Sequence, residues 1–238
     1  MNESLVLIEG PDPVRVHSVR LIGGEAQPLW QSPADGEGVD LLSPVELAID
    51  SDRDRVLVSS LVLGTPGAGG GGPPDRTDYF VGAIDLTTQE RTIFSGQDVG
   101  EGEAMLFPFG LALFPELERL AVGDSGRIHW IDLETGDRSI LHERDSVPGF
   151  RPSRLEADPD GGRLFSFDSF DLWELEVATG AVRRVASIDA LRYAGGSDIE
   201  YDAERGVAMV LVGGLLYTVD VGKRFGEVTD ASWVLSGR

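Results

Sequence analysis

Apolar and polar residues alternate with a period of two along most of this chain. Residues 14–22 are typical, with Val14, Val16, Val19 and Leu21 apolar. Because successive side chains of a β-strand point to opposite faces, such alternation predicts strands with one face toward a core. Clusters of Gly, Pro and Asp interrupt the runs and predict the turns between them. The pattern therefore predicts an all-β fold, and no segment predicts a convincing helix.

A longer repeat is superimposed on this alternation. One unit occurs three times with a period of 44 residues, at Gly110, Arg154 and Asp198 (110 to 154 to 198). A period of ~40 to 50 residues with four strands in each unit is typical of a β-propeller. A four-stranded sheet cannot bury both faces alone, whereas sheets packed face to face around an axis can. We therefore predict a β-propeller of four-stranded antiparallel blades.

An acidic residue recurs in the third strand of each complete unit, opposite in direction to its apolar neighbours. These acidic residues are Asp85, Asp132, Glu176 and Asp220. Acidic side chains are mostly exposed in folded proteins. We expect this position to be solvated or bonded to the following turn.

The predicted strands group into one partial and four complete units within a single domain, residues 1–238. The predicted blades cover approximately residues 4–32, 45–96, 107–143, 151–189 and 196–237. Because the first unit lacks an opening strand, we predict five blades with an incomplete first blade; the alternative is a fragment of a six-bladed propeller. Residues 65–78 are rich in Gly and Pro and are predicted to form an insertion. The four tryptophans recur on strands and are expected to pack between blades.

The charge of the chain limits its partners. It has 20 basic and 41 acidic residues, a net charge of −21. Nucleic acid is excluded as a partner because it requires a basic footprint. No apolar run approaches the ~18 to 20 residues of a membrane span. We expect a monomer that binds a protein or a small molecule. No signal peptide is visible in this chain, so the localisation stays open, and an extracytoplasmic location would require a leader that has been removed.

Several kinds of catalytic site are disfavoured. The chain has no cysteine, which rules out disulfides, thiolate zinc sites and cysteine nucleophiles. His17, His129 and His142 lack zinc-site spacing and are expected to be packed or at the surface. The Asp-Ser pairs at 124–125 and 168–169 have no histidine in register, so we expect no serine triad.

Long connections are expected at one end of the blades. In an up-and-down blade, the connections from second to third strand and from fourth strand to the next blade lie at the same end. The longest connections all fall there, at residues 65–78, 97–107, 144–151 and 189–196. Long loops on a rigid scaffold commonly carry binding sites. We therefore expect the loop-bearing face to bind the ligand.

The repeat motifs at residues 108–113, 120–124 and 131–138 resemble the NHL-type and SMP-30/gluconolactonase-like repeats of bacterial propellers. The resemblance covers nearly the whole chain from Val14. In SMP-30-like lactonases, a divalent metal is held by carboxylates and an asparagine near the inner ring of strands. The resemblance thus implies a candidate calcium or magnesium site built from hard oxygen ligands. Such a metal would polarise a lactone carbonyl and activate water.

Five side chains are candidates for a ligand site at the central channel: Glu46, Arg154, Asp198, Asp124 and Asp168. Asp198 matches the position of the family's inner aspartate, which makes it a candidate metal ligand and the candidate catalytic residue. Glu46 would supply a second metal-binding carboxylate. The asparagine ligand is missing, because the chain's only asparagine is at position 2. Arg154 adds a positive charge that favours a salt-bridged channel instead.

Two functions are compatible with these observations. The first is a propeller scaffold that binds a protein or small ligand through its loop-bearing face and has no catalytic constellation. The alternative is a divalent-metal-dependent lactone or ester hydrolase with its site at the central channel. Whether the protein is an enzyme is left open, because a propeller hosts many functions.

Overall fold

The computed structural model describes residues 4–9, 15–20, 26–31, 42–63, 77–143, 146–168, 171–187, 197–212 and 215–222. In this part of the chain all regular elements are β-strands, apart from two single 3-10 turns, η1 (Ser51–Arg53) and η2 (Pro115–Leu117). The prediction of an all-β fold is confirmed. Most of the expected insertion at 65–78 and the expected last strand at 233–237 lie outside the described residues.

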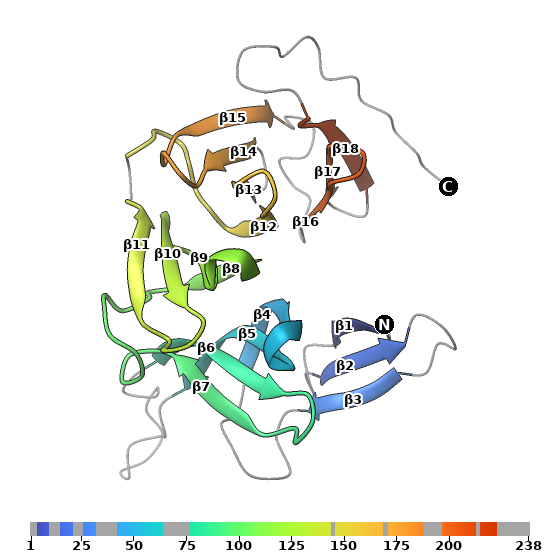
Figure 1. The fold of residues 1–238 in the computed structure, drawn as a ribbon, viewed down its shortest axis with the longest axis vertical. Helices are drawn as coiled ribbons and strands as arrows, with labels where there is room; N and C mark the ends of the chain where they lie inside the picture. Colours follow the sequence, from blue (N-terminus) through green and yellow to red (C-terminus); the bar gives the residue numbers. More distant parts are fainter. Residues whose placement is uncertain are drawn as a thin grey trace, which may run out of the picture. The chain divides into compact units, whose positions relative to one another are not determined.

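The strands form five antiparallel sheets in which neighbours in the chain are neighbours in the sheet (Figure 1). The first sheet contains β1 (Ser4–Glu9), β2 (Arg15–Arg20) and β3 (Ala26–Gln31). The second contains β4 (Leu42–Asp50), β5 (Arg55–Leu63), β6 (Thr77–Asp85) and β7 (Arg91–Ser95). The third contains β8 (Pro108–Phe114), β9 (Arg119–Asp124), β10 (Arg127–Asp132) and β11 (Arg138–His142).

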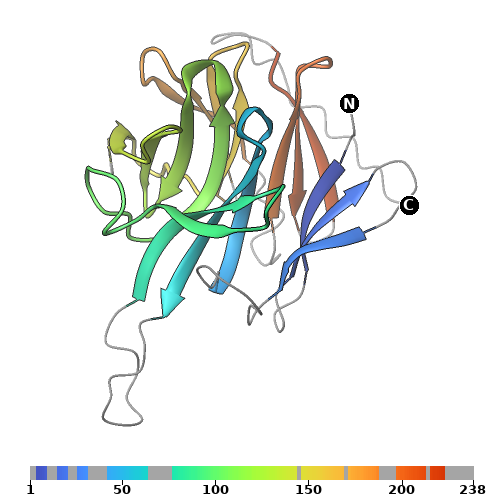
Figure 2. The same ribbon diagram turned by 60° about the horizontal axis from the view of Figure 1, so that its bottom comes forward.

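The fourth sheet contains β12 (Arg154–Asp158), β13 (Arg163–Phe167), β14 (Asp171–Glu176) and β15 (Val182–Ser187). The last contains β16 (Ser197–Asp202), β17 (Val207–Val212) and β18 (Leu215–Asp220) (Figure 2). The contacts divide the chain into two compact units. The first comprises residues 1–108 and 131–139, and the second comprises residues 109–130 and 140–238.

In the second unit, apolar cores form between successive sheets. Side chains of β8 and β9 pack with those of β12–β14, and Trp173 is part of this core. Trp130 packs edge-on against Phe114, with ring centroids 5.2 Å apart. A second core joins β13–β15 to β16–β18. The expected packing of tryptophans between blades is confirmed for Trp173, whereas the ring contact of Trp130 is with Phe114 of its own sheet. The side chains at positions 30 and 233 lie outside the described residues.

Strands β8 and β12 approach each other closely at Gly110. A Cβ atom at this position would lie 2.4 Å from the carbonyl oxygen of Ser153 and 2.8 Å from the amide nitrogen of Leu155. Real Cβ atoms do not approach backbone atoms so closely, so a side chain would force the strands apart. The first of the repeated positions, Gly110, is therefore glycine because the next sheet begins against it.

The acidic residues of the third strands bond to the turns that follow them. Asp85 Oδ1 accepts the amides of Thr87 and Thr88, at 2.9 and 2.7 Å. The equivalent Asp132 and Asp220 accept turn amides in the same way, and Glu176 accepts the hydroxyl of Thr179. The hydrogen bonds from Thr87 and Thr88, above all the one from the Thr88 amide, lower the pKa of Asp85. The expectation of a turn-bonding role is confirmed.

Buried Asp–Arg pairs connect neighbouring sheets. Within the first unit, the Arg55 guanidinium donates to Asp50 Oδ2 at 2.9 Å and to the Leu133 carbonyl at 2.7 Å. Its central carbon also lies 4.3 Å from the centre of the Phe94 ring. The guanidinium thus satisfies a carboxylate in its own sheet and a carbonyl in the third sheet.

The same arrangement recurs in the second unit. Arg163 donates from Nε to Asp158 Oδ2 at 2.8 Å, from Nη1 to the Val221 carbonyl at 2.8 Å and from Nη2 to the Tyr201 hydroxyl at 2.9 Å. Burial alone would lower the pKa of Arg163, but the hydrogen bond to Asp158 and its charge more than offset this and raise the pKa. One sheet is therefore fastened to the next by a charge-assisted hydrogen-bond network.

Candidate functional site

Two of the predicted channel residues take part in hairpin contacts. The Asp124 carboxylate lies 3.2 Å from His129 Nε2 across the β9–β10 hairpin, and both side chains are essentially buried. At the equivalent place in the next sheet, Trp173 Nε1 donates to Asp168 Oδ2 at 3.1 Å. Each aspartate thus meets a ring N–H five residues later in the chain. These contacts give both carboxylates a structural role, and a ligand role for them stays a prediction.

The expectation that no histidine lies in register with the Asp124–Ser125 pair is wrong, because His129 meets Asp124 directly. The pairing does not make a serine triad. The Nδ1 atom of His129 is buried and has no hydrogen-bond partner among the described residues. A triad requires a serine hydroxyl on one ring nitrogen and a carboxylate on the other. His129 is therefore a packed histidine, as expected from its place on a strand.

Arg154 is the first residue of β12, and Asp198 is the second residue of β16. The Arg154 guanidinium is half-buried, and its Nη1 lies 3.4 Å from the carbonyl oxygen of Phe109 on β8. The Asp198 side chain is exposed, and its Oδ1 accepts the amide of Ile199 at 2.9 Å. Glu200 lies on the same face of β16 as Asp198. Partial burial raises the pKa of Glu200, and the Asp198 carboxylate raises it further.

Glu46 is half-buried on β4, and its amide donates to the Ser59 hydroxyl at 3.1 Å. It belongs to the first unit and Asp198 to the second. Among the described residues, no group of three or more His, Asp or Glu side chains is arranged to hold a metal ion. The calcium or magnesium site at Glu46 and Asp198 stays a prediction.

A small pocket lies at the loop end of β8 in the second unit. It is lined by Phe109, Ser125, Gly126 and residues 151–153. Its wall includes the β9–β10 turn, where Ser125 adopts a φ of 43°. The pocket is shallow with a mixed polar and apolar lining, and it lies at the end of its sheet where long connections were predicted.

The connection from β7 to β8, residues 96–107, is held in place by one buried arginine. The Arg138 guanidinium donates to five acceptors around it: the carbonyls of Glu103, Val99, Gly100 and Gly102, and the hydroxyl of Ser95. The shorter of these bonds measure 2.8 to 2.9 Å. Burial lowers the pKa of Arg138, although an arginine stays charged at neutral pH.

Further bonds fix the same loop from its outer side. The amide of Glu101 donates to Asp137 Oδ1 at 2.6 Å, and this bond lowers the pKa of Asp137. Gly100 and Gly102 have φ values of 74° and 98°, and a Cβ at either position would meet a backbone carbonyl oxygen at 2.2 Å. Only glycine is compatible with this path. The loop therefore has one well-defined conformation.

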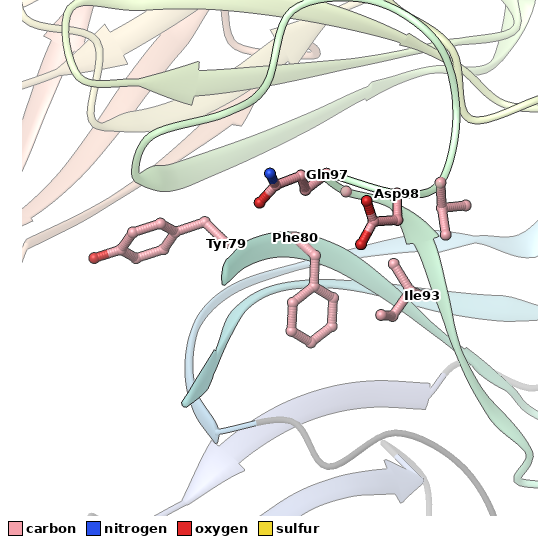
Figure 3. A pocket seen from close by; sticks show the side chains of 7 residues that line it. Tyr79, Phe80, Ile93, Gln97 and Asp98 are labelled. Atoms are coloured by element: carbon pink, nitrogen blue, oxygen red, sulfur yellow. The ribbon is translucent and has the colours of Figure 1, made fainter. Parts of the chain in front are cut away.

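Between this loop and the strands that carry it lies an apolar pocket of about 120 Å³. Phe80 on β6 and Ile93 on β7 form its strand side, and residues 96–99 close it from the loop (Figure 3). Tyr79 lies at one side of the pocket, and its ring packs against Phe107 with centroids 4.7 Å apart. The residue before Phe107 in the chain, Leu106, is 57% exposed.

The loop that closes the pocket is acidic, and one of its carboxylates, that of Asp98, lines the pocket. The side chains of Asp98, Glu101 and Glu103 are exposed on the loop, and the loop contains no basic residue. Figure 3 shows the Asp98 carboxylate close to Ile93, with the Gln97 amide beside it. An apolar pocket, a pair of aromatic rings and negatively charged side chains therefore lie together at this loop.

Sequence reasoning predicted that residues 97–107 would be a binding loop, but it missed the pocket-lining residues Tyr79, Phe80 and Ile93. It also missed the arginine that holds the loop. The signal in the sequence is weak: the glycines at 100 and 102 indicate a constrained backbone, but Arg138 follows 35 residues after Glu103. Its role depends on the third sheet placing it under the loop.

Nowhere in the described part of the chain does a helix reach the length and apolarity that a bilayer crossing requires. No model of a known protein family matches the sequence, and no curated protein matches it. Solved structures do match: a chain of the crystal structure of the nidogen/laminin complex superimposes with a TM-score of 0.67. It is 16% identical, and the alignment covers 93% of this chain and 75% of that chain.

This likeness is shared by 621 chains of solved structures, so it identifies an architecture and not a single relative. At 16% identity it establishes the fold alone. Together with the five successive antiparallel sheets, it shows that the chain has a β-propeller fold. The number of blades and the specific NHL or SMP-30 relationship stay predictions.

Proposed function

We propose that this protein is a non-catalytic propeller scaffold that binds a protein, or a small ligand, through the loop-bearing ends of its blades. The observation that supports this most is the loop at residues 96–107. Four of its carbonyls accept hydrogen bonds from Arg138 before any ligand arrives. A preformed loop loses little conformational entropy on binding, so more of the contact energy contributes to affinity.

The one Asp–His pair in the described part of the chain is buried, and no serine hydroxyl meets the other ring nitrogen of its histidine. A general base must lie within hydrogen-bond reach of the proton it removes from a substrate. The resembling chain from the nidogen/laminin complex belongs to a complex of two proteins. By analogy of fold, this supports a protein as the partner here.

The divalent-metal-dependent lactonase or ester hydrolase is the second candidate. The observation that favours it is the pair of Asp198 and Glu200 on one face of β16, where partial burial raises the pKa of Glu200 and the crowding of negative charge by Asp198 raises it further. A cation would relieve that crowding. Glu46 and Asp198 would be its ligands, with calcium or magnesium as the metal.

Two measurements on the full chain separate these functions. We expect no turnover of a panel of lactones and p-nitrophenyl esters, with or without added calcium or magnesium. Metal-dependent turnover that is lost in Asp198→Ala would contradict the binding proposal and support the hydrolase. An Asp202→Ala variant is the matched control, because it removes an aspartate from the other end of the same strand.

The second measurement concerns the loop. We expect Arg138→Met to increase amide hydrogen exchange across residues 99–103, because four of their carbonyls lose a guanidinium donor. Arg119→Met, at the start of β9, is the control and should leave exchange in this loop unchanged. Unchanged exchange in Arg138→Met would mean that the loop is not held as described.

A further inference from the structure

We infer that the pocket between the 96–107 loop and strands β6 and β7 is a docking site for one apolar side chain of a basic polypeptide segment. The inference rests on the proposed binding function and specifies the chemistry of the partner. It is carried by the size of the pocket, the aromatic pair beside it and the charge around it.

The size of the pocket selects a single side chain. A volume of about 120 Å³ is close to that of cavities of about 150 Å³ that admit a benzene-sized molecule. The side chain of leucine, isoleucine or methionine is therefore of the right size. The lining by Phe80, Ile93 and Val99 is apolar, so burying such a side chain there is favourable.

The surroundings select the residues that flank it. Two exposed carboxylates, Asp98 and Glu101, lie on the loop, which contains no basic residue. The rings of Tyr79 and Phe107 pack together at the side of the pocket. Arginine and lysine combine well with both features, through ion pairs with the loop carboxylates and through contact with aromatic faces. The whole chain carries a net charge of −21, which steers a basic segment toward it.

The arrangement is also rigid, which is a requirement for a docking pocket. Arg138 holds the loop backbone at Val99, Gly100, Gly102 and Glu103. The amide of Gly96 bonds to the Val99 carbonyl at 2.9 Å and closes the loop over the pocket. The anchor site and the acidic loop are therefore presented in a fixed relation to each other.

The experiment uses a phage-displayed library of random 12-residue peptides, selected on the immobilised full chain. We expect enriched peptides to carry an excess of Arg and Lys around one Leu, Ile or Met. In the Asp98→Lys/Glu101→Lys double variant, affinity for these peptides should fall roughly tenfold, since each exposed ion pair contributes a factor of a few. Glu116→Lys/Glu134→Lys changes the charge of the chain equally at sites outside the loop and should change affinity less than about twofold.

A size-swap variant tests the pocket itself. Ile93→Ala enlarges it, so selection should shift from Leu, Ile or Met toward Phe or Trp at the apolar position. Where this variant fails to fold, the charge-reversal pair still decides the question. Three results would each overturn the inference: enriched peptides without an excess of Arg and Lys, an equal loss of peptide affinity in both double variants, or no enrichment of any peptide.

These outcomes are distinct from failure of the proposed function. Basic peptides whose hydrogen-exchange footprint falls on the loop at residues 146–153 would refute this docking site and leave the binding function standing. Metal-dependent turnover of lactones would instead remove the proposed function, whatever the peptides show.

Discussion

Replacing Arg163 with methionine should destabilise the protein by about 3 kcal/mol. The substitution removes the cation from Asp158, whose side chain is only 5% exposed, and leaves that carboxylate buried without its partner. Removing one member of a buried ion pair costs about 3–5 kcal/mol. The lower end applies because Arg163 is 19% exposed and because the Gly161 amide still donates to Asp158 Oδ1. For a chain of this size, the melting temperature should fall by roughly 6–12 °C.

Thermal and urea unfolding, followed by circular dichroism, measure this loss. The control is Arg205→Met, which removes a 3.0 Å pair with Asp202 in which the arginine is 78% exposed. Exposed pairs contribute about 0–1 kcal/mol, so the control should shift the midpoint little. The double variant Asp158→Asn/Arg163→Met should recover part of the loss, because a neutral amide is cheaper to bury than a carboxylate. Equal shifts in Arg163→Met and Arg205→Met would refute the reasoning.

Three further predictions concern side chains in the second unit. Burial lowers the pKa of His142, so the folded protein disfavours the protonated imidazole. The stability of the wild-type protein should therefore fall as the pH drops through about 6.5. Melting curves between pH 5 and 7.5 should show a smaller loss of stability in His142→Gln. Gly110→Ala should lower the free energy of unfolding by about 1–3 kcal/mol, because the added Cβ collides with β12. In the control Gly180→Ala, the added Cβ meets no atom within 4 Å and only the positive φ opposes it. Equal urea midpoints in the two variants would contradict the close approach at Gly110. Partial burial and the Asp198 carboxylate raise the pKa of Glu200, so the folded protein disfavours its charged form. Glu200→Gln should therefore be more stable than wild type at pH 7, and this gain should shrink as the pH falls toward about 4.5 and be absent below it.

The strands and turns could be predicted well from local pattern. The alternation at residues 14–22 marks the position of β2 (Arg15–Arg20), and the long connection expected at residues 97–107 lies between β7 (Arg91–Ser95) and β8 (Pro108–Phe114). Alternation reports which face of a strand is buried, and turn residues report where the chain reverses; both signals extend over only a few residues. The 44-residue period then predicted the sheets, because each copy reproduces the same local pattern.

The candidate site was predicted less well, because its contacts join residues far apart in the chain. Asp124 and Asp168 were expected at the channel, yet each meets a ring nitrogen across its own hairpin. The pairing of Asp158 with Arg163 spans a turn and was open to sequence reasoning, but its extension to the Val221 carbonyl was not. The spacing of two charged residues in a sequence does not indicate which backbone carbonyl of another sheet also accepts a hydrogen bond from the arginine.

Local pattern and repetition thus establish that this chain forms successive antiparallel sheets with acidic, turn-bonded corners. They also indicate that its long connections gather at one end of each sheet. Only packing decides that Arg138 lies beneath residues 96–107 and that Tyr79, Phe80 and Ile93 enclose a pocket there. The reason is physical: strand formation depends on neighbours within a few residues, whereas a pocket depends on side chains that meet once separate strands have docked.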